Sequence, residues 1–274
     1  MNIMYCGDQQ MAQGLVLSLI SVLKNTTEPV HFYILTAQIT NKKQQFLPLS
    51  DEFVGRLDHY ARQFTPENSV VKFEITDLFT AEPPVANLNT SFTPNCMLRL
   101  YADLIPELPD KILYLDTDVL CRQDFSQFYH QDLSDGEIAG TLDHYGKWFF
   151  HRQLRLFDYI NSGVLLLNLA QIRRSGLFAK CRQKCQRTRM FMPDQSALNR
   201  LCHTKIITDT KYNEQHRLNQ DTVFQHFTTS FKFLPRFKIR TIKPWQQKLL
   251  HEELGIYEYD DLLKESTKLL TANH

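Results

Sequence analysis

Two aspartates stand one residue apart directly after an apolar run, in the segment DKILYLDTDVLC. Asp116 and Asp118, separated by Thr117, follow the apolar residues 112–115, and the chain is apolar again from Val119. Charged side chains beside a buried strand need a partner, because burial of an unpaired carboxylate is costly. If the strand continues, both carboxylates point to the same side, and if the chain turns here, both can reach one cation. All-oxygen ligation suits Mg²⁺ or Mn²⁺ better than zinc. From this spacing alone, a capping or ion-paired role for the two carboxylates is an equally good explanation.

The elements that would position these carboxylates alternate between strand and helix patterns. In chain order they are a strand in NIMYCG (2–7), a helix in GLVLSLISVLKNT that ends near Asn25, a strand in VHFYILT (30–36), a helical region over 44–64 and a strand in SVVKFEI (69–75). Such alternation predicts βαβ units with a parallel sheet. Ligands of such sheets bind beyond the carboxyl ends of the strands. Asp8 follows one such end and the Asp116–Asp118 pair follows another, so we predict an α/β, nucleotide-binding architecture.

The rest of the chain continues in the same manner. The segments expected to be regular are a helix in NCMLRLYADLIPEL, strands in EIAGTLD and SGVLLLNL, and helices in SGLFAKCRQKCQRTR and MPDQSALNRLC. Past Thr222 the chain continues through VFQHFTTSFKFL and FKIRTIKPW to a polar helical tail from Gln246. The basic residues of SGLFAKCRQKCQRTR are expected on the solvent-facing side of their helix. No repeat or linker is visible, so we predict one domain over 1–245, with 246–274 as its C-terminal helical extension.

The composition is that of an ordinary globular protein. The 274 residues are 43% hydrophobic and carry a formal net charge of +1, which argues against nucleic-acid binding driven by the overall charge. Six cysteines include no CxxC pair, so zinc and thioredoxin-like sites are weakly supported. With no signal peptide and no long apolar run, we expect free thiols and a cytoplasmic location.

Five motifs occur in a fixed order along most of the chain. They are NIMYCGDQQMAQGLVLSLISVLKNT, RLYADLIPELPDKILYLDTDVL, YINSGVLLLNL, PDQSALN and KPW, and together they run from Asn2 to Trp245. This series resembles glycosyltransferase family 8, which contains bacterial lipopolysaccharide galactosyl- and glucosyltransferases and glycogenin. The resemblance implies a GT-A type fold, a mostly parallel central sheet flanked by helices, a UDP-sugar donor, Mn²⁺ with Mg²⁺ as the alternative, and transfer with retention at the anomeric carbon.

The resemblance also implies a metal site. Asp116 and Asp118 match the metal-binding DxD motif, and His226 of the segment HFTT matches the family's third ligand in type. His226 lies seventeen positions before Lys243, farther than is usual in the family, and Phe237 and Lys238 occupy the usual position. Either His226 reaches the metal while the intervening segment loops out, or His226 is a buried, hydrogen-bonded core histidine.

Three further positions match residues that bind the nucleotide. Asp8 matches the residue that contacts uracil, although an aspartate here would also cap the following helix. Arg99 matches a basic residue that reaches the nucleotide and the DxD motif, and an ion pair with a DxD carboxylate is compatible with that role. Lys243 matches the lysine that meets the diphosphate, and a solvated lysine before a turn is the alternative.

The last group matches residues around the donor sugar. Asn161 would lie beside the sugar, with a turn residue at the start of a strand as the alternative. Asp194 would bind sugar hydroxyls, unless it caps its helix, and Gln195 would face the anomeric carbon opposite the leaving group. Asp143 lies where the family often has an acidic residue near the acceptor. Because glutamine is a poor nucleophile, front-face attack with the diphosphate as base is the favoured route.

A basic and aromatic stretch late in the chain is open to several interpretations. Its members are Lys232, Arg236, Lys238, Arg240, Lys243 and Lys248, interleaved with Phe231, Phe233, Phe237 and Trp245. A nucleic-acid strip, a peripheral contact with anionic lipid, or two strands with basic solvent faces would each fit. The membrane interpretation gains weight if the acceptor is a lipid-linked glycan.

The expected activity is transfer of a hexose from UDP-glucose or UDP-galactose to a hydroxyl of a cell-envelope or protein-linked glycan. The alternatives are a UDP-sugar hydrolase or nucleotidyltransferase on the same fold, and a non-catalytic protein that binds UDP-sugars.

Overall fold

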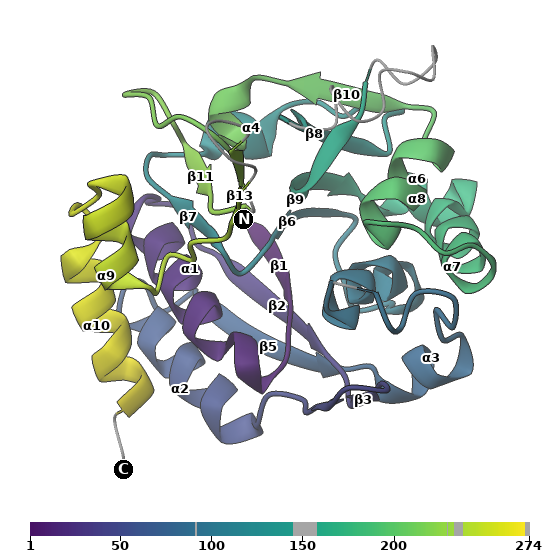
Figure 1. Cartoon of the computed structure of the whole chain (residues 1–274), viewed down its shortest axis with the longest axis horizontal. Helices are drawn as coiled ribbons and strands as arrows, with labels where there is room; N and C mark the ends of the chain where they lie inside the picture. The colour runs from purple at the N-terminus through teal and green to yellow at the C-terminus, as the bar shows by residue number, and fades with distance from the viewer. Residues whose placement is uncertain (91, 145–157, 229, 233–237, 272–274) are drawn as a thin grey trace.

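The fold is built on a mostly parallel, seven-stranded sheet with helices packed on both faces (Figure 1). A computed structural model of the chain describes residues 1–90, 92–144, 158–228, 230–232 and 238–271, with side chains described except over 229–240. The strand order in the sheet is β10-β8-β9-β6-β1-β2-β5. The α/β class expected from the sequence is confirmed.

The strands that form this sheet are β1 (Asn2–Cys6), β2 (His31–Thr36), β5 (Ser69–Glu74), β6 (Lys111–Leu115), β8 (Ile138–Leu142), β9 (Ile160–Asn168) and β10 (Lys205–Thr208). Strand β9 runs antiparallel to its neighbours β6 and β8, and the other pairs are parallel. Shorter two-stranded pairs join β3 (Ile39–Thr40) to β4 (Gln45–Phe46), β7 (Val119–Cys121) to β11 (Phe224–His226), and β12 (Ser230–Lys232) to β13 (Lys238–Arg240).

Helices and single helical turns connect these strands. They are η1 (Gln9–Met11), α1 (Ala12–Lys24), α2 (Asp51–Arg62), α3 (Thr76–Ala81), η2 (Pro94–Leu104), α4 (Ser126–His130), α6 (Leu169–Ser175), α7 (Leu177–Arg187), α8 (Pro193–Leu201), η3 (Thr210–Tyr212), α9 (Gln247–Leu249), η4 (Leu250–Leu254) and α10 (Asp260–Thr271). Within the described part of the chain, no helix combines the length and the apolar character needed to span a bilayer.

Side chains of the central strands alternate between two hydrophobic cores, one on each face of the sheet. In β1, Ile3 and Tyr5 pack with α1, α2 and α10, whereas Met4 and Cys6 pack with η2, α7 and α8. Successive side chains of a strand point to opposite faces, so a strand that is buried on both faces reads as a continuous apolar run. This is why β1 and β6 are visible in the sequence as short apolar blocks.

Helix α1 lies directly beside the turn that carries the two aspartates. A methyl group on Gly14 would come within 2.6 Å of the Thr117 carbonyl oxygen and 2.6 Å of Cζ3 of Trp245. The absence of a side chain at Gly14 therefore lets α1, the Asp116–Asp118 turn and the KPW segment pack together. The helix ends at Asn25, as predicted, where the Asn25 N–H donates to the Val22 carbonyl.

Two predictions about helices need correction. The helical region expected over 44–64 is shorter, because residues 45–46 form β4 and the helix begins only at Asp51. Pro48 disfavours an earlier start, and the side chain of Ser50 caps the helix by accepting from the Phe53 N–H. The helical segment around Arg99 is confirmed as helical, but it is wound as a 3₁₀-helix.

The solvent-facing position predicted for the basic residues of α7 is wrong for Arg182. Its side chain is buried, pairs with Asp103 and Glu82, and stacks 5.3 Å above the ring of Tyr101. Burial lowers the pKa of this guanidinium, but Asp103 and Glu82 outweigh burial and raise it above the ordinary value. A charge becomes tolerable in a core when carboxylates neutralise it, and helical periodicity alone carries no sign of such partners.

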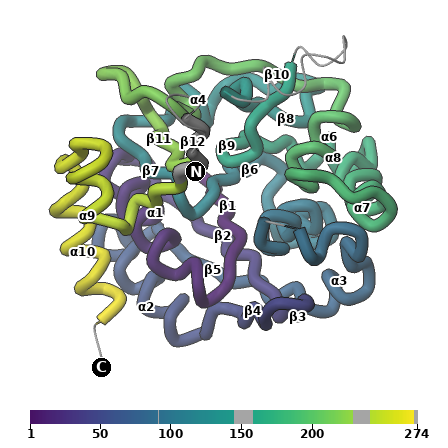
Figure 2. The backbone as a smooth tube through the Cα atoms, viewed as in Figure 1, coloured from purple at the N-terminus to yellow at the C-terminus, as the bar shows by residue number. Residues whose placement is uncertain are grey.

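The C-terminal helix packs against the first part of the chain. In Figure 2 the yellow end of the chain lies beside the purple α1, and Leu262 and Leu263 of α10 belong to the same core cluster as the leucines of α1. Glu265 of α10 bonds to Lys24 of α1 and to Tyr60 of α2. The division into 1–245 and a 246–274 extension of the same domain stays a prediction.

Candidate active site

The two aspartates lie on either side of a tight turn at the carboxyl end of β6. The Asp116 N–H donates to the Gly163 carbonyl at 2.8 Å, and the Val119 N–H closes the turn on the Asp116 carbonyl at 3.1 Å. Because β1 pairs with β6 in parallel, Asp8 follows the neighbouring strand at the same edge of the sheet. The predicted meeting of these carboxyl ends is confirmed.

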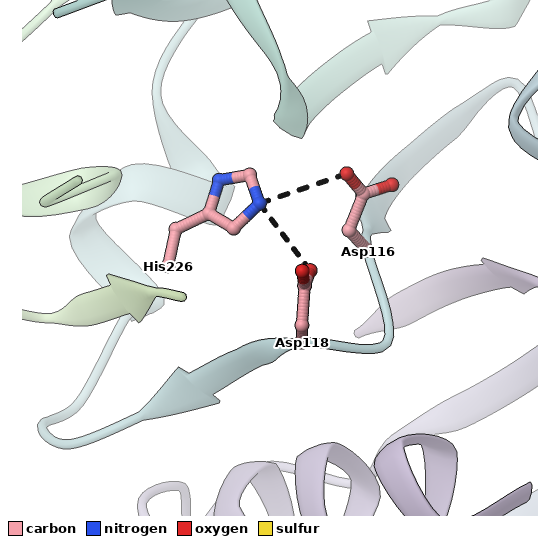
Figure 3. A group of neighbouring side chains, drawn as sticks. All are labelled: Asp116, Asp118 and His226. Atoms are coloured by element: carbon pink, nitrogen blue, oxygen red, sulfur yellow. Dashed lines mark ion pairs between the residues drawn. The ribbon is translucent and has the colours of Figure 1, made fainter. Parts of the chain in front are cut away.

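His226 reaches both aspartates because β11 pairs with β7. The register sets His226 opposite Val119, one residue beyond Asp118. Its Nε2 lies 3.3 Å from Oδ1 of Asp118 and 3.7 Å from Oδ2 of Asp116, and Figure 3 shows the ring edge directed at both carboxylates. His226 is buried and hydrogen-bonded, as its alternative interpretation requires, but its free edge faces the aspartates.

These three side chains form a group that suits a divalent cation. One ligand atom from each of Asp116, Asp118 and His226 lies within 4.8 Å of the others. Carboxylate oxygens with one imidazole nitrogen are a donor set that Mn²⁺ accepts readily, and Mg²⁺ favours the oxygens. The residues present therefore fit the metal that the resemblance implies.

Lys243 enters the same group from the KPW segment. Its ammonium binds Oδ2 of Asp118 and donates to the Phe227 carbonyl at 3.2 Å, so the interpretation of Lys243 as a solvated lysine is wrong. Burial alone would raise the pKa of the Asp118 carboxyl, but Lys243 and His226 outweigh burial and hold it well below its ordinary value. Asp118 is therefore an anion that is available to positive partners.

Arg99 joins the metal group to the predicted sugar group. Its buried guanidinium lies 2.9 Å from Oδ1 of Asp116 through Nη2 and 3.4 Å from Oδ2 of Asp194 through Nε, and it stacks 3.8 Å above the Tyr114 ring. Burial disfavours the guanidinium charge, yet Tyr114 and the two carboxylates outweigh it and hold the pKa of Arg99 above its ordinary value. The ion pair expected for Arg99 is confirmed.

The residues predicted around the donor sugar form one buried network. Oε1 of Gln195 accepts from the Ser162 N–H at 2.9 Å, and its Nε2 donates to Oδ2 of Asp143 at 3.1 Å. The same Asp143 oxygen accepts from Nδ2 of Asn161 at 2.8 Å. Asp194 accepts from the Ser162 hydroxyl at 3.2 Å.

Two alternative interpretations of aspartates as helix caps have opposite outcomes. Helix α8 begins at Pro193 with Met192 at its N-cap, so a capping role for Asp194 is wrong. Asp8 does cap η1, since its Oδ1 accepts from the N–H groups of Gln10 and Met11 at 2.9 and 3.2 Å. Its other oxygen, Oδ2, is buried without a hydrogen-bond partner among the described residues. The cap and a ligand contact are therefore compatible at Asp8.

Sequence reasoning missed three residues that the fold brings into the site. Asn213 lies just after η3 and hydrogen-bonds to both Asn161 and His226, and no local pattern singles it out. Ser162 stands inside the NSG motif, but the motif itself does not indicate its hydrogen bonds to Gln195 and Asp194. Gly163 follows Ser162, and the close approach of the His226 ring to it can be known only from the fold.

Part of the basic and aromatic stretch lies outside the described residues. These are Phe233, Arg236 and Phe237, and the side chains of Phe231, Lys232, Lys238 and Arg240 are outside the description as well. Lys243 belongs to the site, and Lys248 is an exposed surface residue. The membrane and nucleic-acid interpretations of this stretch, and the cytoplasmic location, stay predictions.

A family model and several known proteins match this chain. The family model described as Glycosyl transferase family 8 matches residues 2–248. The chain is 24% identical over 261 residues to a lipopolysaccharide 1,3-galactosyltransferase of Salmonella typhimurium, which covers 89% of this chain and 72% of that protein. It is 28% identical over 168 residues to the lipopolysaccharide glucosyltransferase WaaO of Escherichia coli, which covers 53% of this chain and 46% of WaaO. A Haemophilus influenzae relative is 24% identical over 217 residues, and the match covers 60% of that protein. The matches therefore span less than two thirds of WaaO and of the Haemophilus influenzae relative.

Solved structures share the fold. A crystal structure of an active-site mutant of LgtC gives a TM-score of 0.72 at 17% identity, over 100% of this chain and 98% of that chain. The galactosyltransferase LgtC in complex with donor and acceptor sugar analogs gives 0.68 at 18% identity over the same shares of the two chains. This likeness confirms the GT-A type fold expected from the sequence.

Proposed function

Because the chain belongs to glycosyl transferase family 8, we propose that it is a retaining, metal-dependent hexosyltransferase that uses a UDP-sugar. The observation that carries the proposal is the meeting of Asp116, Asp118 and His226 with Lys243, beside the buried Asp194 and Gln195. These residues come from segments that are far apart in the sequence. A fold stabilised by its hydrophobic cores alone would have no need to gather so many charges at one sheet edge.

The donor would bind along this edge. Asp8 offers a buried carboxylate oxygen without a partner to the base, and Arg99 stands between the two charged groups of the site. Asp116, Asp118 and His226 would hold Mn²⁺, with Mg²⁺ as the alternative. When bound, the cation supplies positive charge that offsets the charge of the diphosphate leaving group.

Lys243 would supply a second positive charge to the diphosphate. Its ammonium binds Asp118, one of the proposed metal ligands, which supports a place for it next to the proposed metal site. A compact ammonium stabilises developing negative charge as a point charge and needs no fixed geometry of its own. Release of the diphosphate is the step that this charge would favour.

Gln195 and its neighbours would orient the sugar. Both ends of the Gln195 amide are hydrogen-bonded, to Ser162 and to Asp143, so the group is fixed in place. An amide is a poor nucleophile, which favours attack by the acceptor hydroxyl on the same face as the departing diphosphate, with the diphosphate taking the proton. Asp194 and Asn161 would contact sugar hydroxyls, and Asp143 would lie on the acceptor side.

The acceptor would be a hydroxyl of a cell-envelope or protein-linked glycan. Two of the relatives are described as lipopolysaccharide glycosyltransferases, and LgtC was crystallised with donor and acceptor sugar analogs. The donor would be UDP-glucose or UDP-galactose, and a lipid-linked acceptor would place the enzyme at a membrane surface.

The test is release of UDP from a panel of UDP-sugars without acceptor, in Mn²⁺ or in EDTA. Slow release from one sugar that needs Mn²⁺ would name the donor and support the proposal. The Asp118→Ala variant serves as the matched control and should release no UDP above background. A thermal shift with UDP and Mn²⁺ but no release in any acceptor mixture would instead indicate a non-catalytic UDP-sugar-binding protein. Full release in EDTA would overturn the metal-dependent mechanism.

A further inference from the structure

A series of hydrogen bonds with fixed donors and acceptors ends at Nδ1 of His226, the ring nitrogen that faces away from the aspartates. It begins at the backbone N–H of Gly163, which donates to Oδ1 of Asn161 at 2.9 Å. A backbone N–H can only donate, so this bond fixes which end of the Asn161 amide is the oxygen. The other end, Nδ2, donates to the Asp143 carboxylate at 2.8 Å, which agrees with this assignment because a carboxylate only accepts.

The orientation of the Asn161 amide determines that of the Asn213 amide, which in turn determines which nitrogen of His226 carries a proton. Nδ2 of Asn213 donates to Oδ1 of Asn161 at 3.0 Å, so Oδ1 of Asn213 is turned toward Nδ1 of His226, also at 3.0 Å. An amide oxygen is an acceptor, so Nδ1 of His226 must carry a proton. In the neutral ring, Nε2 then holds the lone pair and faces Asp116 and Asp118.

For the neutral ring this arrangement is unfavourable, and it becomes favourable when a positive charge, either a proton on Nε2 or a metal ion, lies between the ring and the two carboxylates. A lone pair directed at two carboxylates 3.3 and 3.7 Å away is repelled by both of them. With a divalent cation between the three groups, the same geometry becomes attractive. Asn161, Asn213 and His226 are all buried, so solvent does not compete for these bonds.

We propose that Asn213 is a positioning residue that, backed by Asn161, selects the tautomer in which His226 can coordinate the metal. This inference rests on the proposed function and adds to it a residue that lies outside the five motifs named above. Histidine ligands depend on such partners of the second nitrogen, and the loss of one weakens metal binding about 10- to 100-fold.

The experiment measures the metal directly, without turnover. Mn²⁺ is titrated into the 274-residue chain in the presence of UDP, and free Mn²⁺ is followed by electron paramagnetic resonance. Coupling of bound Mn²⁺ to an imidazole nitrogen is measured by electron spin echo modulation. We expect Asn213→Ala to weaken Mn²⁺ binding about 10-fold or more and to lose the nitrogen coupling. If Asn213→Ala does not fold, Asn213→Leu replaces it, because leucine is similar in size and offers no acceptor.

A conservative variant separates positioning from simple packing. Asn213→Asp keeps an acceptor for Nδ1 of His226, so it should retain the nitrogen coupling. If Asn213 served only to support Asn161, Asn213→Asp would weaken Mn²⁺ binding more than Asn213→Ala does, because the new carboxylate would face Oδ1 of Asn161.

Asn87→Ala is the matched control. Asn87 is a fully buried asparagine that bonds to the backbone of Cys185, Thr188 and Met190, with no contact to the metal group. Its loss should lower thermal stability but leave Mn²⁺ affinity and the nitrogen coupling unchanged.

The outcomes distinguish this inference from the proposed function. If the wild-type protein binds Mn²⁺ with nitrogen coupling and Asn213→Ala does so equally well, the positioning role is overturned while the proposed function stands. If the wild-type protein binds no Mn²⁺ even with UDP, the proposed function fails, and the role of Asn213 fails with it.

Discussion

Gly163 and His226 lie so close together that no side chain fits between them. A methyl group on Gly163 would come within 2.0 Å of Cε1 of His226 and 2.6 Å of its Nδ1. Gly163 belongs to β9, which also supplies the carbonyl that holds the Asp116 N–H. The same residue thus anchors the aspartate turn through its backbone and leaves room for the imidazole through its missing side chain.

Gly163→Ala should therefore displace the His226 ring. We expect Mn²⁺ affinity in the presence of UDP to fall about 10-fold or more, since one ligand is lost or misdirected. The added methyl group should also lower the free energy of unfolding by about 1–3 kcal/mol, as overpacking usually does. Titration with Mn²⁺ and urea denaturation measure the two effects.

The control for this change is Gly55→Ala. A methyl group on Gly55 of α2 would meet no atom within 4 Å, so it should be neutral or slightly stabilising in the helix. Unchanged Mn²⁺ affinity in Gly163→Ala would show that the ring can move without consequence for the metal.

Gly14→Ala should disturb the opposite side of the site. The methyl group would press on the Thr117 carbonyl and on the Trp245 ring, and so on both the aspartate turn and the KPW segment. We expect the free energy of unfolding to fall by about 1–3 kcal/mol and UDP release to slow, because Asp118 and Lys243 would shift together. A stability equal to that of the wild-type protein would mean that Trp245 can rotate away at little cost.

Lys243→Ala should slow UDP release by about 100-fold, the usual cost of losing one group that stabilises developing charge. Lys248→Ala is the control, since its ammonium is exposed and 3.9 Å from Glu252. A rate within twofold of wild type for Lys243→Ala would assign the charge on the leaving group to another cation.

The elements of this fold could be predicted where local pattern and tertiary packing agree. We could recognise β1 and β6 by their apolar blocks and α1 by its leucines, because the sheet is buried on both faces. The buried position of Arg182 could not be predicted, because its partners Asp103 and Glu82 are far from it in the sequence. A basic residue on a helix looks the same in sequence whether its charge faces solvent or a carboxylate.

The site residues also divide into those that a local sequence pattern predicts and those that only the fold brings together. Asp116 and Asp118 stand out because carboxylates interrupt an apolar strand. The sequence indicates His226 only through the resemblance of its segment to a family motif, and its approach to Asp118 depends on the pairing of β11 with β7. Asn213 carries no signal at all, since its importance comes from the two side chains that the fold places on either side of it.

The docking of α10 should depend on pH through Glu265. Burial raises the pKa of this carboxyl, but Lys24 and Tyr60 outweigh burial and lower it below its ordinary value. A group with a lowered pKa in the folded state stabilises the fold above its unfolded pKa, about 4.3 for glutamate, and loses that contribution as the pH falls through the folded value. Glu265→Gln should therefore be less stable than the wild-type protein at pH 7, and the difference should narrow below about pH 4. Urea denaturation between about pH 3 and pH 7 measures this difference in the free energy of unfolding, and Glu252→Gln on the exposed surface is the control. A difference that stayed constant with pH would show that packing, rather than charge, holds α10 in place.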